Sequence, residues 1–145
     1  QRFRGNYMDD KLEALKQTSI FSALDEKHLQ AVAKITDRVH VKEGRILIYE
    51  GQVVTHMYMI IEGSASVKLD DKVVATLGEG AVIGELAMVD DAPSSATVTI
   101  EEESTVWLIP RAGFLPVWED YPEISHAMLK AVVARLREAD KMLHG

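Results

Sequence analysis

The feature that most constrains this chain is the period of its hydrophobic residues, which changes twice. From Thr36 on, apolar residues begin to alternate with polar ones, as at Val39 and Val41. A period of two is that of a β-strand with one buried face. Before and after this stretch, apolar residues recur every three to four positions, which is the period of a helix. The sequence therefore predicts helices, then a block of strands, then helices.

Short strands and closely spaced turns fill the middle block. The alternation recurs over 65–69, 96–100 and 106–108, whereas Met57–Ile61 is apolar throughout, as in a central strand covered on both faces. Short strands joined by glycine-containing turns favour a β-barrel of the jelly-roll type over a parallel sheet. The turn sequences lie at Glu43-Gly44, Glu50-Gly51, Glu62-Gly63, Asp70-Asp71 and Gly78-Glu79-Gly80.

Two helices are predicted before the strands. Asp10 and Glu13 fit a capping box for the first helix. Asp25 fits the N-cap of the second, whose apolar side carries Leu29 and Val32. We therefore expect residues 1–35 to form N-terminal helices.

Two more helices are predicted after the strands. Phe114–Trp118 indicates a short apolar helix, and Pro122 suits the first turn of a long one. Its apolar residues step by three and four in turn, which is the spacing of a coiled-coil seam. Two alternatives are open: this stripe packs on the chain's own barrel, or it forms a homodimer seam. The stripe consists of Leu129, Val132, Leu136, Ala139 and Leu143.

Length and charge limit the class of protein. A chain of 145 residues fits one domain, here residues 1–145, with the barrel at 36–109 and the C-terminal helices at 110–145. The net charge of −7 argues against a nucleic-acid partner, which would need a basic surface. No apolar run is long enough for membrane insertion, and no secretory leader opens the chain, so we expect a cytoplasmic protein.

Catalytic and metal-binding motifs are not found. The chain has no cysteine, so thiolate chemistry is excluded. Its five histidines form no His-x-His pair of the kind that a cupin-like metal site needs, so we expect no metal ligands and no cofactor. The sequence also lacks a Gly-x-Ser-x-Gly nucleophile motif. We therefore expect a binding protein and not an enzyme.

One segment, residues 80–88, does not fit a plain strand. A strand end runs into Gly84, where a glycine allows close approach of the backbone to a ligand. A helical turn beginning at Glu85 would present free N–H groups, which suit a phosphate. A carboxylate at that turn can accept hydrogen bonds from sugar hydroxyls. Together these features predict a nucleotide site.

The order and spacing of several motifs resemble the cyclic-nucleotide-binding domain family, which includes catabolite activator proteins, protein kinase A regulatory subunits and cyclic-nucleotide-gated channels. The motifs are Gly44, Gly51, Tyr58–Gly63, Gly80, Ile83–Ala87 and Pro93–Val98. The resemblance implies a cyclic nucleotide, cAMP or cGMP, as ligand. It also implies that Gly84, Leu86 and Ala87 belong to the phosphate-binding cassette. Glu85 would hold the ribose 2′-hydroxyl, and Leu129–Leu136 would act as a lid.

The sequence departs from the family at one position. The family places an arginine against the cyclic phosphate, and Ser94 stands there in this chain. Ser94 and Ser95 can each donate a hydrogen bond, but neither supplies charge. The missing charge-assisted bond is worth about ten- to a hundredfold in affinity. Arg45, Lys68 and Arg111 are the basic residues that we consider as replacements.

Two functions follow from these features. The first is a regulatory sensor in which the nucleotide moves the C-terminal helix, attached to a larger protein or acting on a partner. The second is a degenerate domain that binds no nucleotide tightly and uses its last helix for dimerisation or protein interaction. The Ser94 departure supports the second. The sequence does not decide which nucleotide binds.

Overall fold

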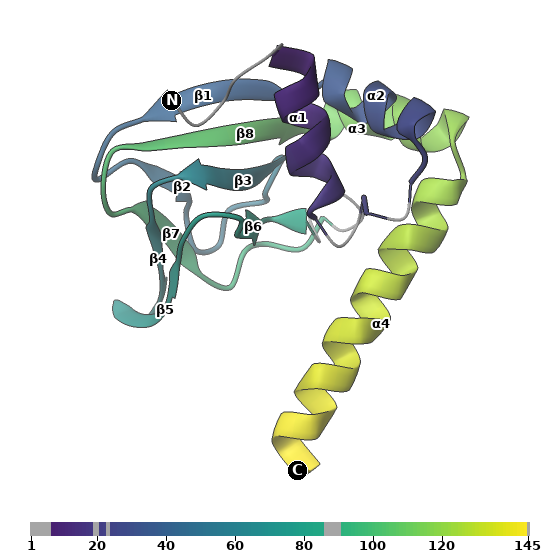
Figure 1. The fold of residues 1–145 in the computed structure, drawn as a ribbon. Helices are drawn as coiled ribbons and strands as arrows, with labels where there is room; N and C mark the ends of the chain where they lie inside the picture. The colour runs from purple at the N-terminus through teal and green to yellow at the C-terminus, as the bar shows by residue number, and fades with distance from the viewer. Residues whose placement is uncertain (1–6, 19–20, 23, 86–90, 145) are drawn as a thin grey trace. The chain divides into compact units, whose positions relative to one another are not determined.

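The computed structural model describes residues 7–18, 21–22, 24–85 and 91–144, and Figure 1 shows its helices and strands. By the contacts between its residues, the chain divides into two compact units. Residues 35–115 form a strand unit, and residues 1–34 together with 116–145 form a helical unit.

In the described residues, the strand unit contains two antiparallel sheets of four strands each. One sheet has the order β1-β8-β3-β6 and the other β2-β7-β4-β5. This arrangement confirms the predicted mainly β fold with flanking helices. The strands are β1 (Asp37–Val41), β2 (Ile46–Ile48), β3 (His56–Glu62), β4 (Ala65–Leu69), β5 (Lys72–Leu77), β6 (Val82–Ile83), β7 (Thr97–Ile100) and β8 (Ser104–Pro110).

Left-handed backbone conformations form the turns between strands, as the turn sequences predict. Asp70 and Asp71, with φ of 50° and 67°, join β4 to β5 in a two-residue turn. Two positive φ angles in succession match the right-handed twist of a hairpin, and Asp tolerates them better than most residues. Gly63 lies between β3 and β4 with φ of 111°, where a Cβ would overlap the Ser104 side chain. Only glycine fits this turn without displacing β8.

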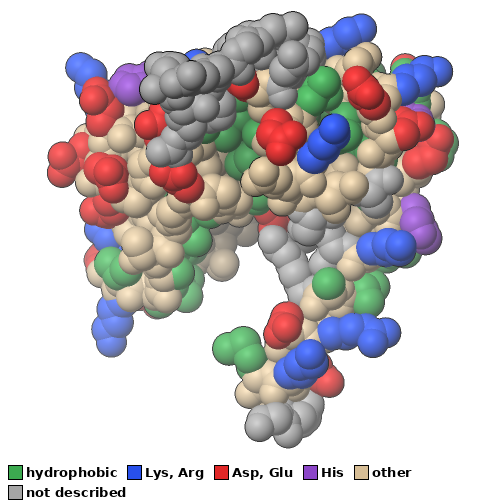
Figure 2. Space-filling model, viewed as in Figure 1, with side chains coloured by type: hydrophobic (Ala, Val, Ile, Leu, Met, Phe, Trp, Pro, Cys, Tyr) green, Lys and Arg blue, Asp and Glu red, His purple; other side chains and the backbone are tan. Residues whose placement is uncertain are grey.

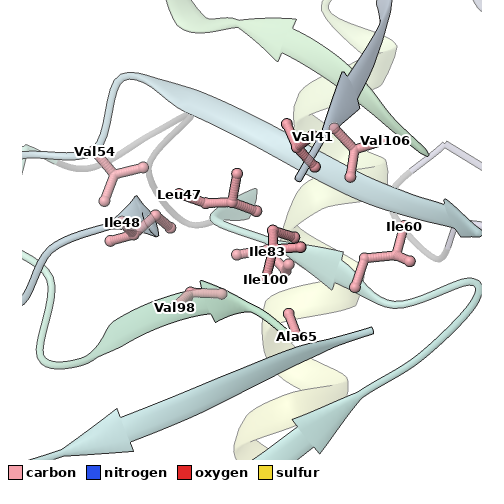
Figure 3. Close-up of a cluster of buried hydrophobic side chains, with 10 residues drawn as sticks. All are labelled: Val41, Leu47, Ile48, Val54, Ile60, Ala65, Ile83, Val98, Ile100 and Val106. Carbon is pink, nitrogen blue, oxygen red and sulfur yellow. The ribbon is translucent and has the colours of Figure 1, made fainter. Parts of the chain in front are cut away.

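The core of the strand unit lies between the two sheets. β3, β6, β8 and β1 contribute from one sheet, and β2, β7 and β4 from the other, so that their side chains meet in Figure 3. Ile60 is fully buried and Ile100 is 1% exposed. Burying one such side chain contributes about 1.5–3 kcal/mol. The buried cluster consists of Val41, Leu47, Ile48, Val54, Ile60, Ala65, Ile83, Val98, Ile100 and Val106.

The opposite faces of β3 and β8 are buried as well. Met57 and Met59 on β3 are buried, which confirms the doubly covered strand predicted from its apolar run. For β8 the prediction of alternation was wrong, because Trp107 and Ile109 are as buried as Val106. β8 lies between β1 and β3 in its sheet and carries buried side chains on both faces, so its sequence is apolar without alternation.

The helical unit contains α1 (Tyr7–Lys16), α2 (Glu26–Lys34) and α4 (Glu123–His144). Asp25 caps α2 as predicted, since its carboxylate accepts a hydrogen bond from His28 N at 3.0 Å. The predicted capping box at Asp10 was wrong, because α1 begins at Tyr7 and includes Asp10. No glycine or proline separates Asn6 from Asp10, so nothing in this stretch stops the helix from starting earlier.

α3 (Arg111–Asp120) contains the short apolar helix predicted from the sequence, with Phe114 buried and Pro116 inside the helix. It begins in the strand unit and ends in the helical unit, with the boundary between Leu115 and Pro116.

α4 has a buried beginning and an exposed remainder. Ile124 and Met128 are buried, whereas Leu129 is 61% exposed and Leu136 is 63% exposed. Hydrophobic, basic and acidic side chains share the surface of this helix in Figure 2. Across the described residues, no helix combines the length and apolar character needed to cross a bilayer.

Candidate functional site

Gly84 occupies a position that only glycine suits. It follows the end of β6 at Ile83 and has φ of 81°, in the left-handed region that L side chains rarely adopt. A Cβ there would lie 2.9 Å from the carbonyl oxygen of His56 and 3.4 Å from Cγ1 of Val54. The backbone at Gly84 is therefore pressed against the segment that leads into β3.

Glu85 follows directly and is only 8% exposed. Carboxylates are seldom buried to this degree unless they have hydrogen-bond or charge partners. The left-handed turn at Gly84 thus sets a buried carboxylate at the end of a strand. Leu86 and Ala87, which the family resemblance assigns to the same cassette, lie outside the described residues.

Ser94 is held by its backbone and by its hydroxyl. Its N–H donates to the carbonyl of Gln52 at 2.8 Å, and its carbonyl accepts from the N–H of Gly51 at 2.7 Å. The Ser94 Oγ donates to the carbonyl of Ala96 at 2.7 Å and accepts from the N–H of Ala96 at 3.2 Å. The hydroxyl closes a turn of its own loop, whereas Ser95 is exposed.

One short segment, residues 51–56, connects the two predicted parts of the site. Gly51 and Gln52 pair with Ser94, and Val53 forms a bridge with Pro93. At the other end of the segment, the carbonyl of His56 lies against Gly84. The Gly84 turn and the Ser94 loop are therefore attached to the same piece of backbone.

The role of this segment was not predicted from the sequence. Its contacts are backbone hydrogen bonds to residues about 40 positions away, which leave no periodic pattern in the side chains. Its signals in the sequence were the Glu50-Gly51 turn and the place of Gly51 among the motifs of the family resemblance.

The three candidate cations lie in different surroundings. Arg111 forms an ion pair with Asp91, and its N–H donates to the carbonyl of Thr55 at 2.9 Å. Lys68 lines a surface cavity of about 410 Å³ whose walls include Glu50, Asp70 and Asp71. Of the three, Arg111 alone is linked by these contacts to the segment that carries the site.

Arg45 is exposed, and its charge acts on Tyr58. Tyr58 stands opposite Ile83 in the pairing of β3 with β6, one residue from Gly84. Burial raises the pKa of the Tyr58 phenol above its ordinary value of 10.0, and the nearby positive charge of Arg45 partly opposes that rise. Because this pKa lies above 10.0, the side chain is neutral at physiological pH. Its hydroxyl donates to the carbonyl of Leu47 at 3.5 Å.

Within the described ranges, no three His, Cys, Asp or Glu residues come together as metal ligands. Two of the histidines lie against carboxylates instead. His28 lies between Asp25 at 2.5 Å and Glu123 at 3.3 Å, and His40 lies 3.1 Å from Glu103.

Two facing four-stranded sheets with a glycine-carboxylate turn at the end of β6 define a β-sandwich module with flanking helices. The family model for the cyclic nucleotide-binding domain matches residues 38–121. The chain belongs to the cyclic nucleotide-binding domain family.

Known proteins resemble it over most of its length. An uncharacterized NTE family protein of Mycobacterium tuberculosis is 28% identical over 131 residues, which is 90% of this chain and 22% of that protein. The regulatory domain of Toxoplasma gondii protein kinase A, solved with cAMP, superposes with a TM-score of 0.71 at 29% identity. That match covers 79% of this chain and 46% of the other.

A third relative carries a different ligand. The regulatory subunit of a cAMP-independent protein kinase A from Trypanosoma cruzi, solved with guanosine, has a TM-score of 0.71 at 26% identity. The match covers 79% of this chain and 42% of that one. The chain thus spans about a fifth of the length of its mycobacterial relative and less than half of either solved structure.

Proposed function

We propose that this chain is a regulatory domain that binds a cyclic nucleotide or a related nucleoside at the Gly84–Glu85 turn. The observation that carries the proposal is the buried carboxylate of Glu85 beside a left-handed glycine, in a domain of this family. A carboxylate in this position can accept hydrogen bonds from both hydroxyls of a ribose or from the single 2′-hydroxyl of a cyclic nucleotide. Ser94 and Ser95, on the loop attached to the same segment 51–56, are the proposed hydroxyl contacts.

The ligands of the relatives set the panel of compounds to test. cAMP is bound by the Toxoplasma domain and guanosine by the Trypanosoma subunit, so both a cyclic nucleotide and a nucleoside are reasonable ligands for this chain. The proposed output is a movement of the helical unit, α4 in particular. A ligand drives such a movement only to the extent that it binds one arrangement better than another.

Thermal unfolding with adenosine, guanosine, cAMP and cGMP tests the binding. A ligand at about a hundred times its dissociation constant stabilises a fold by about 2.7 kcal/mol. Glu85→Gln should abolish the shift, whereas Glu79→Gln, on an exposed turn six residues earlier, should keep it. The proposal would be refuted if none of the four compounds raised the melting temperature of either the unmodified chain or the Glu79→Gln control.

One observation favours the second candidate function, a domain that acts through protein contacts. The apolar residues Leu129, Leu136 and Leu143 on α4 are 61%, 63% and 79% exposed. Exposed leucines at heptad spacing are typical of a helix that pairs with another. Sedimentation of the chain with and without Leu136→Glu tests this alternative: a dimer that the substitution dissociates, together with an absent nucleotide shift, would establish it.

A further inference from the structure

The stretch of chain that carries the proposed site brings no positive charge, and the exposed Arg45 near Tyr58 belongs to another turn. Between Lys72 and Arg111 the sequence contains no Lys, Arg or His. The Gly84 turn and the Ser94 loop both fall in this stretch, so neither brings a positive charge of its own. The same stretch carries acidic residues at Glu79, Glu85, Asp90, Asp91 and Glu101–Glu103.

Ser94 does not make up for the missing charge. Its hydroxyl already makes two hydrogen bonds with Ala96, one as donor at 2.7 Å and one as acceptor at 3.2 Å. A phosphate oxygen could take the donor bond only if the bond to the Ala96 carbonyl were given up. The exchange replaces one neutral hydrogen bond with another and brings no cation to the phosphate.

Of the three candidate cations, Arg111 is the one whose backbone contacts residues 51–56, and its charge is paired. The backbone N–H of Arg111 donates a hydrogen bond to the Thr55 carbonyl, and its guanidinium forms an ion pair with Asp91. The Arg111 side chain is 22% exposed and that of Asp91 is 80% exposed. Asp91 thus fills the place that an anionic ligand would need at this guanidinium.

These surroundings favour a neutral ligand. A cyclic phosphate carries a negative charge into a site where Glu85 is an acceptor and only 8% exposed. Two negative charges that share a partly buried site repel each other more strongly than they would in water. The ribose of a nucleoside brings hydroxyl donors for the Glu85 carboxylate and no charge.

We propose that this site selects an uncharged ribonucleoside over the matching cyclic nucleotide. The proposal rests on the proposed function, because it names the ligand class of the same site. Asp91 and Ser94 set the selectivity: Asp91 occupies Arg111, and Ser94 stands where a phosphate-binding arginine would be.

Calorimetric titration of the full chain with two matched pairs tests this selectivity. Adenosine is compared with cAMP and guanosine with cGMP, so that each comparison isolates the cyclic phosphate. We expect the better nucleoside to bind at least about tenfold more tightly than its cyclic nucleotide. Ser94→Arg should improve cyclic-nucleotide binding by about ten- to a hundredfold, the range expected for a charge-assisted bond. Val74→Arg, at an exposed position on β5, adds the same charge outside the proposed site; it is the control and should gain much less.

Asp91→Asn provides a second variant that leaves the Ser94 loop intact. It frees Arg111 without adding a side chain, so cyclic-nucleotide affinity should rise while nucleoside affinity stays unchanged.

The possible results separate the two proposals. Cyclic nucleotides that bind the unmodified chain as tightly as nucleosides would overturn the selectivity and leave the proposed function standing. Binding of cyclic nucleotides by Ser94→Arg, with no ligand for the unmodified chain, would overturn the selectivity and favour the degenerate domain. A chain and variants that bind none of the four compounds would overturn both.

Discussion

The sharpest structural prediction concerns Gly84, which carries both a left-handed φ and a close backbone neighbour. Replacing it with alanine places an L side chain at φ of 81°, which costs about 1–2 kcal/mol. The new Cβ would also lie 2.9 Å from the carbonyl oxygen of His56, a backbone atom of β3 that cannot rotate away. Forcing an extra carbon into a packed position costs about 1–3 kcal/mol more.

A matched control separates these two costs. Gly80 has φ of 86°, close to that of Gly84, but a Cβ there would meet nothing within 4 Å. Gly80→Ala therefore carries the strain alone. In both variants alanine lowers the conformational entropy of the unfolded chain, and this stabilisation offsets about 0.4–1 kcal/mol of the cost in the folded state. We expect a net loss of about 1 kcal/mol for Gly80→Ala and about 3 kcal/mol for Gly84→Ala.

Chemical denaturation and thermal unfolding measure the difference. For a chain of 145 residues, 1 kcal/mol corresponds to about 2–4 °C, so Gly84→Ala should melt several degrees below Gly80→Ala. The rise in melting temperature on adding ligand should be smaller in Gly84→Ala and unchanged in Gly80→Ala, because only the Gly84 substitution displaces backbone next to Glu85. Equal melting temperatures for the two variants would show that the Gly84 turn is not pressed against β3, and the reasoning about this site would fail.

Three further predictions concern the core, the phenol of β3 and the cap of α2. Ile60→Ala, at a fully buried position between the sheets, should lower the free energy of unfolding by about 2–5 kcal/mol in urea, and a loss below 1 kcal/mol would contradict the described core. Burial raises the pKa of Tyr58, so the stability that its neutral form supplies is present below pH 10 and is lost as the pH rises further. Between pH 9 and pH 11 the unfolding midpoint of Tyr58→Phe should therefore fall less than that of the unmodified chain, and parallel curves would disprove this. The hydrogen bond from His28 N lowers the pKa of Asp25 below 3.8, so the stabilisation by the ionised carboxylate is present above pH 3.8 and disappears as the pH falls through the lowered pKa. Asn caps a helix without ionising, so Asp25→Asn should lose less stability than the unmodified chain between pH 6 and pH 3. Equal losses would show that the cap does not form.

The sequence predicted the parts of the fold that depend on local pattern. Gly44 and Gly63 adopt positive φ at turns identified from composition, and Asp25 caps the helix that its position indicates. The strand β5 left no such signal. Val73 and Val74 are 57% and 54% exposed, and β5 has exposed side chains along nearly its whole length, so no buried face produces an alternation to detect.

The candidate site also has parts that a local sequence pattern predicts and parts that it does not. Gly84 and Glu85 were proposed from a strand end followed by a helical turn, together with the family resemblance. The role of residues 51–56 and the bond between Ser94 and Ala96 could not be predicted, because both depend on how loops far apart in the sequence fit together. The pairing of Arg111 with Asp91 joins residues 20 positions apart and is equally invisible to periodicity.

The division of the chain into two units makes the strand unit an insertion within a discontinuous helical unit. The backbone crosses between them at the Lys34–Ile35 and Leu115–Pro116 links, and both ends of the chain belong to the helical unit. A domain joined at either end would therefore be covalently connected to the helices and not to the strands that carry Gly84 and Ser94. Exchanging residues 35–115 for those of a relative would transfer ligand specificity while keeping the attachment to such a domain unchanged.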